Sequence, residues 1–169
     1  MIDLVRVIIT EVKEGVIKRF SGRGRAGETL RDRELLQHYG FTSRPLSGSE
    51  GIVLKKGNVV FLLASDDRRY RIKLEDGEVA LYTDEGDHIH FRRGRQIHVA
   101  CGNKVVVDAG EDVEVNTKRA VLNAAESAQV NAPAVEVSCD TLQAAASQQA
   151  VLSAPLVSLA AASITVSPQ

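Results

Sequence analysis

The sequence predicts an all-β protein built in two parts, a small barrel followed by a narrow shaft. In the first half, short apolar runs alternate with turn-forming residues, as in β-barrels and sandwiches. From Ile97 to Gln169, brief apolar–polar alternations recur, which is the pattern of strands with one buried face. No aromatic residue follows Phe91 and no glycine follows Gly110. We therefore divide the chain into residues 1–95 and 96–169.

Charge separates the same two parts. Residues 1–95 hold 18 Lys and Arg against 15 Asp and Glu, about +3, whereas residues 96–169 hold 3 against 7, about −4. The net charge of −1 does not favour a nucleic acid or a membrane surface as partner. The N-terminus lacks the apolar run of a signal peptide, and no segment approaches the ~18 apolar residues of a membrane span. These features predict synthesis in a cytoplasm.

The first two strands are expected within residues 5–20, on either side of a turn at Glu14 and Gly15. The Gly- and Arg-rich segment Ser21–Glu28 resembles a phosphate or nucleic-acid cradle in composition. We interpret it as a mobile surface loop, because no Walker-type lysine follows it. The next segment, Thr29–Gln37, fits either a strand or a short helical turn.

The segment His38–Gly51 is rich in turn formers and carries two aromatic residues, which predicts irregular structure anchored by packing. Four short strands are then expected, at Ile52–Leu54, Val59–Ala64, Tyr70–Leu74 and Val79–Tyr82. A five-stranded barrel of the OB type fits residues 5–85 best. Such barrels bind oligonucleotides through exposed aromatics on a basic face. The aromatics here, such as Phe61, lie within apolar runs and are expected in the core.

His88 and His90 stand two residues apart on a predicted strand and therefore point to the same side. Three copies around one axis would bring six imidazoles together, which makes these two residues candidate metal ligands. We favour an arrangement with Ile89 and Phe91 in the core and both histidines in solvent. No cofactor and no other metal site is predicted. The two cysteines show no metal-ligand spacing, and we interpret them as buried free thiols.

The tract from Ile97 onward is predicted to wind repetitively. The sequence VNAPAVEV at residues 130–137 is echoed 22 residues later by LSAPLVSL at 152–159. Ala, Leu and Gln would also suit a helix, above all between Thr141 and Ala150. Three features argue against a helix: the two prolines of the echo, the many Ser, Thr, Asn and Val residues, and the lack of an apolar stripe with a period of 3.6 residues.

A sheet with one apolar face and free edges is an aggregation hazard unless its edges are covered. Three chains wound about one axis would cover these edges by pairing with one another. The three chains would form a thin prism, whose interior has no room for aromatic side chains. Each buried Val or Leu would contribute ~1.5–3 kcal/mol. The residues predicted to fill this trimer core are Val113, Val115, Val121, Val130, Val135, Val137, Val151, Val157, Leu159, Ile164 and Val166.

Three parts of the sequence resemble the Mu-type phage baseplate spike proteins, the cell-puncturing needles of contractile tails. They are the segment Gln37–Glu50, the strands after it, and the motif Gly86-Asp-His-Ile-His leading into an Ala/Val/Ser tract. The stretch Tyr39-Gly-Phe-Thr-Ser with the Pro-Leu after it is the most specific part. The resemblance implies a homotrimer with an N-terminal OB-fold domain and a C-terminal triple-stranded β-helix. It also implies a virion protein, assembled in the host cytoplasm, that binds the tail hub, touches the host outer membrane and punctures it on contraction.

Several spikes of this kind end in a tip whose His-X-His residues bind an axial metal ion. This sequence has no histidine after His98, and His88 and His90 would lie at the base of the shaft, so we do not transfer that role to them. We expect instead a separate tip protein that docks on Ile164, Val166 and Gln169.

Two other functions remain open at this point. An OB-fold nucleic-acid-binding protein with a multimerising tail is disfavoured by the near-neutral barrel. A trimeric acyltransferase is disfavoured because the shaft has no histidine beyond His98 and no nucleophile, base and orienter arrangement is visible. We therefore predict no catalytic residue and no enzymatic activity.

Overall fold

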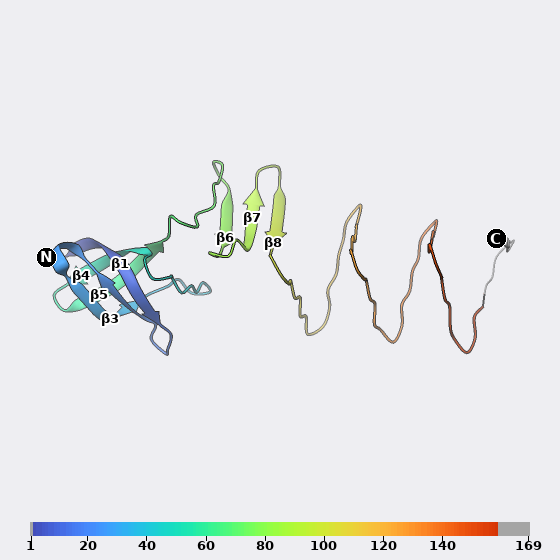
Figure 1. The fold of residues 1–169 in the computed structure, drawn as a ribbon, viewed down its shortest axis with the longest axis horizontal. Coiled ribbons are helices and arrows are strands. Elements are labelled where there is room, and N and C mark those ends of the chain that lie inside the picture. The colour runs from blue at the N-terminus through green and yellow to red at the C-terminus, as the bar shows by residue number, and fades with distance from the viewer. Residues whose placement is uncertain (1, 159–169) are drawn as a thin grey trace. The chain divides into compact units, whose positions relative to one another are not determined.

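The structure is a computed structural model of the 169-residue chain, and it describes residues 2–158. The chain divides into two units, Met1–Val113 and Glu114–Gln169. Five strands of the first unit close into a barrel in the order β1-β2-β3-β5-β4 (Figure 1). They are β1 (Asp3–Lys13), β2 (Arg19–Arg23), β3 (Thr29–Leu35), β4 (Glu50–Lys56) and β5 (Val59–Asp66). The predicted all-β class and five-stranded barrel are confirmed.

The barrel interior is filled by the alternate residues of its strands. In β1, Val7 and Ile9 are buried while Ile8 between them is exposed, as the period of two requires. Phe20 of β2 is the largest fully buried side chain. The full set of buried apolar residues is Val7, Ile9, Val12, Phe20, Leu30, Leu35, Val53, Val60 and Leu62.

The barrel closes unevenly. β1 pairs with β4 along six residues, whereas the parallel pairing of β3 with β5 joins only Glu34 to Phe61 and Leu35 to Leu62. Gly51 of β4 lies against the interior at a place where a Cβ would be 2.5 Å from Leu62 Cδ1 and 3.3 Å from Val7 Cγ2. A side chain at this position would displace core residues, so glycine is needed for close packing.

The ambiguous segment Thr29–Gln37 forms a strand, β3, as far as Leu35, rather than a helical turn. The prediction of a surface loop at Ser21–Glu28 is wrong for its first three residues, which belong to β2. The rest of the segment contains one short 3-10 turn, η1 (Arg25–Gly27), in which Ala26 has a φ of 52°. The predicted hairpin turn at Glu14 and Gly15 is confirmed, because β1 ends at Lys13 and β2 begins at Arg19.

A second sheet follows the barrel, with the order β6-β7-β8 and antiparallel pairing throughout. Its strands are β6 (Val79–Tyr82), β7 (His88–Arg92) and β8 (Gln96–Ala100). The prediction that the barrel extends over residues 5–85 is therefore wrong, since the barrel ends at Asp66. The strand predicted at Tyr70–Leu74 is also absent, because the closed barrel leaves no edge for it to pair with.

Residues 101–158 contain neither helix nor strand, and every one of their side chains is exposed. From Glu114 to Ser158 the trace turns back on itself in successive passes without backbone pairing between them (Figure 1). Both cysteines in this tract, Cys101 and Cys139, are free and exposed, so the prediction of buried thiols is wrong for the single chain. Between Ile2 and Ser158, no helix has the length and apolar character needed to cross a membrane.

Candidate assembly surfaces

One face of the sheet β6-β7-β8 is entirely apolar. Val79 pairs with Phe91 and Leu81 with Ile89 across β6 and β7, and the same two β7 residues pair onward with β8. Paired residues share a face, so these side chains form one surface. Its six members, 39–65% exposed, are Val79, Leu81, Ile89, Phe91, Ile97 and Val99. We call this surface the apolar face; the part of the chain that the structure describes does not bury it.

The opposite face of this sheet carries His88, His90 and His98. His90 is only 6% exposed, whereas Ile89 and Phe91 are 39% and 45% exposed. The predicted arrangement, with both histidines in solvent and these two apolar residues in the core, is therefore wrong for the single chain. The Nε of Arg92 donates to His90 Nδ1 at 3.2 Å, so the proton of the neutral imidazole is on Nε2, which lies 2.9 Å from Glu78 Oε2. Both ring nitrogens of His90 are therefore engaged, and neither is free to bind a metal ion.

Glu78 organises the start of this sheet. Its carboxylate accepts hydrogen bonds from the backbone amides of Arg93 at 2.9 Å and Glu75 at 3.2 Å, in addition to the His90 contact. These bonds, those from the amides first, lower the pKa of Glu78 to about 2. The carboxylate therefore stays ionised at all ordinary pH values and joins β7 to the turn that precedes β6.

His88 and His98 are neighbours, with ring centroids 5.3 Å apart. His88 Nδ1 lies 2.9 Å from the Gly86 carbonyl oxygen, to which it donates. The positive charge of Arg92, followed by burial and the other two histidines, lowers the pKa of His98. Within residues 2–158, no three or more His, Cys, Asp or Glu side chains are grouped so that they could hold a metal ion.

A hydrogen-bond network fixes the segment that leaves the barrel. Ser49, 2% exposed, donates through Oγ to Asp67 Oδ2 at 3.1 Å. Arg69 donates through Nε and Nη2 to the same carboxylate at 2.8 and 2.6 Å, and through Nη2 to the Ser47 carbonyl at 3.1 Å. The Arg69 contacts hold the pKa of Asp67 well below its usual range. The sequence predicts only a turn after β5. The spacing of Asp67 and Arg69, two residues apart, is the signal from which their ion pair could have been predicted.

A second polar network holds the irregular segment Leu36–Leu46, which we call the display loop. Lys18 Nζ donates to Gln37 Oε1 at 3.2 Å, to Thr42 Oγ1 at 2.8 Å and to the Ser43 carbonyl at 2.9 Å. Gln37 Nε2 donates to the carbonyl and to the hydroxyl of Ser43, each at 2.9 Å. The irregular structure predicted for His38–Gly51 is confirmed up to Ser49, since Glu50 and Gly51 begin β4. Polar side chains hold the display loop in place.

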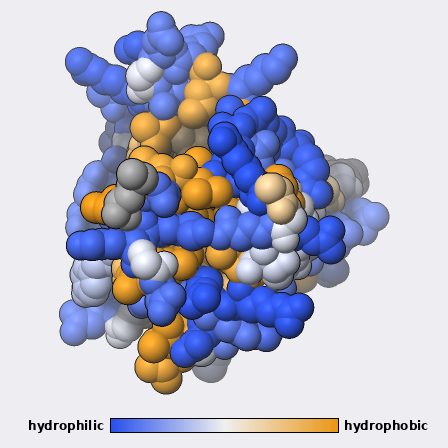
Figure 2. Space-filling view, turned by 90° about the vertical axis from the view of Figure 1, so that its left-hand side faces the viewer, coloured by the Kyte–Doolittle hydropathy of each residue, from blue (hydrophilic) through white to orange (hydrophobic). Residues whose placement is uncertain are grey.

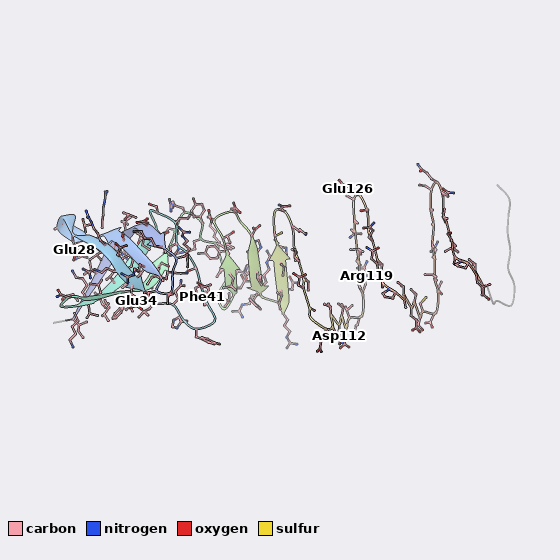
Figure 3. The ribbon with its side chains drawn as sticks, turned by 90° about the horizontal axis from the view of Figure 1, so that it is seen from below. Glu28, Glu34, Phe41, Asp112, Arg119 and Glu126 are labelled. Carbon is pink, nitrogen blue, oxygen red and sulfur yellow. The ribbon has the colours of Figure 1, made fainter. Side chains whose placement is uncertain are left out.

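The two aromatics of the display loop lie outside the core. Tyr39 is fully exposed and Phe41, labelled in Figure 3, is 50% exposed. Their predicted role as packing anchors is therefore wrong. The assignment of Phe61 to the core is also wrong, because Phe61 lies between buried Val60 and Leu62 and so points outward. Figure 2 shows hydrophobic residues (orange) gathered between hydrophilic ones (blue) on the face that it draws.

The predicted trimer core residues do not meet one another in the single chain. Figure 3 shows side chains projecting from the trace along this tract, with Asp112, Arg119 and Glu126 labelled. Eight of the predicted residues lie in the described part, at 49–77% exposure: Val113, Val115, Val121, Val130, Val135, Val137, Val151 and Val157. The others, Leu159, Ile164 and Val166, and the docking residue Gln169, lie outside the described residues.

Comparison with known proteins finds a family model that matches the N-terminal part of the chain and a similar curated protein. Residues 6–69 match the family model described as Bacteriophage Mu Gp45, N-terminal. The chain is 34% identical over 90 residues to the baseplate puncturing device gp45 of Escherichia phage Mu, which covers 51% of this chain and 45% of that protein. The match thus spans less than half of the relative. The resemblance to Mu-type baseplate spike proteins drawn from the sequence is confirmed over this part.

Proposed function

We propose that this protein is the spike of a contractile phage tail or related injection particle, and that it punctures the host outer membrane as a homotrimer. The barrel within residues 1–95 would bind the hub and other baseplate proteins. The tract from residue 96 onward would form the shaft, with three chains wound into a triple-stranded β-helix. The similarity to a protein named as a baseplate puncturing device supports this role.

The observation that carries the proposal is the unpaired state of residues 101–158. A single chain makes no strand there and buries no side chain, although its valines alternate with polar residues as in a half-buried strand. Extended backbone groups need hydrogen-bond partners, and exposed valines need a surface to cover them. Two further copies of the same tract would supply both.

The apolar face of the sheet β6-β7-β8 supports the same arrangement. If three copies turn this face toward a common axis, six apolar side chains from each chain become buried at the base of the shaft. Histidines 88 and 98 on the opposite face would then remain outside. The unpaired edges of β6 and β8 would be free to pair between neighbouring copies.

The function proposed is mechanical, without a catalytic step. Burial of each valine contributes ~1.5–3 kcal/mol, so a shaft with several valines per chain and three chains would unfold slowly. A rigid shaft of this kind converts tail contraction into penetration of the envelope. The same proposal places the protein in the virion baseplate and its folding and trimerisation in the host cytoplasm.

The test combines mass, spectrum and a pair of substitutions. Light scattering should give about three times the chain mass of 18.3 kDa, and circular dichroism a β spectrum. The trimer should resist SDS without boiling. Val135→Asp places a charge on the proposed core side and should abolish the trimer, whereas Ser138→Asp on the polar side should not. A helical monomer would contradict the proposal, and so would equal effects of the two aspartates.

A further inference from the structure

We propose that the display loop is a docking element that inserts Tyr39 and Phe41 into an apolar pocket on a hub protein, a chain different from this one. The inference rests on the proposed function, since it names the part of the barrel that attaches the spike to the tail.

The first argument is the geometry of the loop tip. Gly40, between the two aromatics, has a φ of +79°, a left-handed conformation that glycine adopts without strain. The Phe41 amide donates to the His38 carbonyl at 3.0 Å and closes a tight turn around Tyr39. The turn directs Tyr39 into solvent, where it is fully exposed. Tyrosines in this state are frequent interface anchors, because one ring supplies a large contact area.

The second argument is that the loop is held in shape before any partner binds. The side chain of Lys18 is only 13% exposed, and its ammonium group is surrounded by oxygens of Gln37, Thr42, Ser43 and Glu14. Withdrawing an ammonium group from water is costly unless such partners replace the water. The network stabilises a loop whose tip buries little within its own chain. A pre-organised loop loses less conformational entropy on binding, which favours affinity.

The third argument concerns the chemistry of the partner. The leucines at the two ends of the loop, Leu36 and Leu46, are 46% and 41% exposed and extend the apolar contact. Between Glu34 and Glu50 the sequence contains no acidic residue. Arg44 lies within this stretch and gives it a positive charge. The partner surface is therefore expected to be an apolar pocket with an acidic rim.

The fourth argument separates a hub protein from a second copy of this chain. The surfaces that we assign to self-assembly begin at β6, beyond the barrel, and they are dominated by Val, Leu and Ile. The thin prism formed by these residues excludes aromatics after Phe91. The exposed aromatics of the display loop belong to the barrel, so they remain available to another protein.

Photo-crosslinking tests this contact directly. Benzoylphenylalanine replaces Tyr39 in one variant and Val59, 52% exposed on β5, in a matched control. Assembled tail particles carrying either variant are irradiated, and the crosslinked peptides are identified by mass spectrometry. Position 39 should crosslink to a hub protein, and position 59 should not. A crosslink from position 39 to another copy of this chain, or no crosslink, would overturn the inference.

A substitution experiment distinguishes this inference from the proposed function. The double variant Tyr39→Ser with Phe41→Ser should keep its oligomeric mass and thermal midpoint, while its incorporation into particles falls at least about tenfold. Normal incorporation of the variant would refute the docking role and leave the spike proposal standing. Absence of the unaltered protein from particles would refute the spike proposal itself.

Discussion

The hydroxyl of buried Ser49 donates a 3.1 Å hydrogen bond to the Asp67 carboxylate, and this contact ties the exit of β5 to the entry of β4. The backbone on the Ser49 side is itself fixed, because the Ile9 amide donates to the Ser49 carbonyl at 2.8 Å and the Gly48 amide donates to the Ile9 carbonyl at 2.8 Å. Ile9 is fully buried in the barrel. The segment leaving the barrel is thus connected to the barrel core through Ser49 and Ile9.

Ser49→Ala should lower the free energy of unfolding by about 1 kcal/mol, because the Asp67 carboxylate loses one hydrogen bond at a part-buried contact. Urea denaturation followed by circular dichroism measures the change. Ser65→Ala, at an exposed position of β5, is the matched control and should be neutral. Equal stability of the two variants would show that the contact is unimportant.

Phe20→Ala should lower the free energy of unfolding by about 3–5 kcal/mol, because it empties the largest buried site of the barrel. Phe41→Ala, in the display loop, should change it by less than about 0.5 kcal/mol. Denaturant unfolding of both variants tests the assignment of one aromatic to the core and the other to a surface. A comparable loss from Phe41→Ala would show that the loop aromatic packs after all.

Gly51→Ala should lower the free energy of unfolding by about 1–3 kcal/mol through overpacking, since the new methyl group would collide with the buried side chains of Leu62 and Val7. Gly15→Ala is the control, because its added Cβ would meet only the Ile17 carbonyl oxygen at 3.5 Å. Thermal unfolding monitored by circular dichroism gives both values. A midpoint for Gly51→Ala at or above that of Gly15→Ala would contradict the packing described for β4.

The stability of the sheet β6-β7-β8 should depend on pH through Glu78. The folded state lowers the pKa of this carboxyl from 4.5 to about 2, so its stabilising effect is complete above about pH 4.5 and disappears as the pH falls toward 2. Thermal midpoints of the unaltered protein and of Glu78→Gln should differ at neutral pH and converge over this acidic range. A difference that stays constant down to pH 2 would refute the assignment.

Local sequence patterns predicted the barrel strands well where a strand has one buried face and a clear turn beside it. The hairpin of β1 and β2 is an example, because its alternation and its Glu-Gly turn are both local signals. The secondary structure of Thr29–Gln37 was ambiguous from the sequence, because the spacing of its leucines fits both a strand and a helical turn. Pairing with β2 and β5 decides in favour of a strand, and this information lies outside the segment.

The errors of the sequence analysis concern residues whose surroundings come from distant parts of the chain. Tyr70–Leu74 alternates like a strand, but the barrel had already closed with β4 and β5. His90 is buried by Glu78, whose position depends on the amides of Glu75 and Arg93. Tyr39 and Phe41 look like core residues by type, and only the network around Lys18 shows that their loop is held without them.

The trimeric shaft that we propose for the unpaired tract at residues 101–158 would have a genetic consequence. In a shaft whose strands pair between three chains, one damaged chain destabilises the whole trimer. If a host makes equal amounts of intact and core-damaged chains, about one trimer in eight would contain three intact copies. Alleles that damage the shaft core but still allow the chain to join trimers should therefore be dominant over the intact gene in mixed infection, whereas alleles that abolish trimerisation or prevent barrel folding should be recessive.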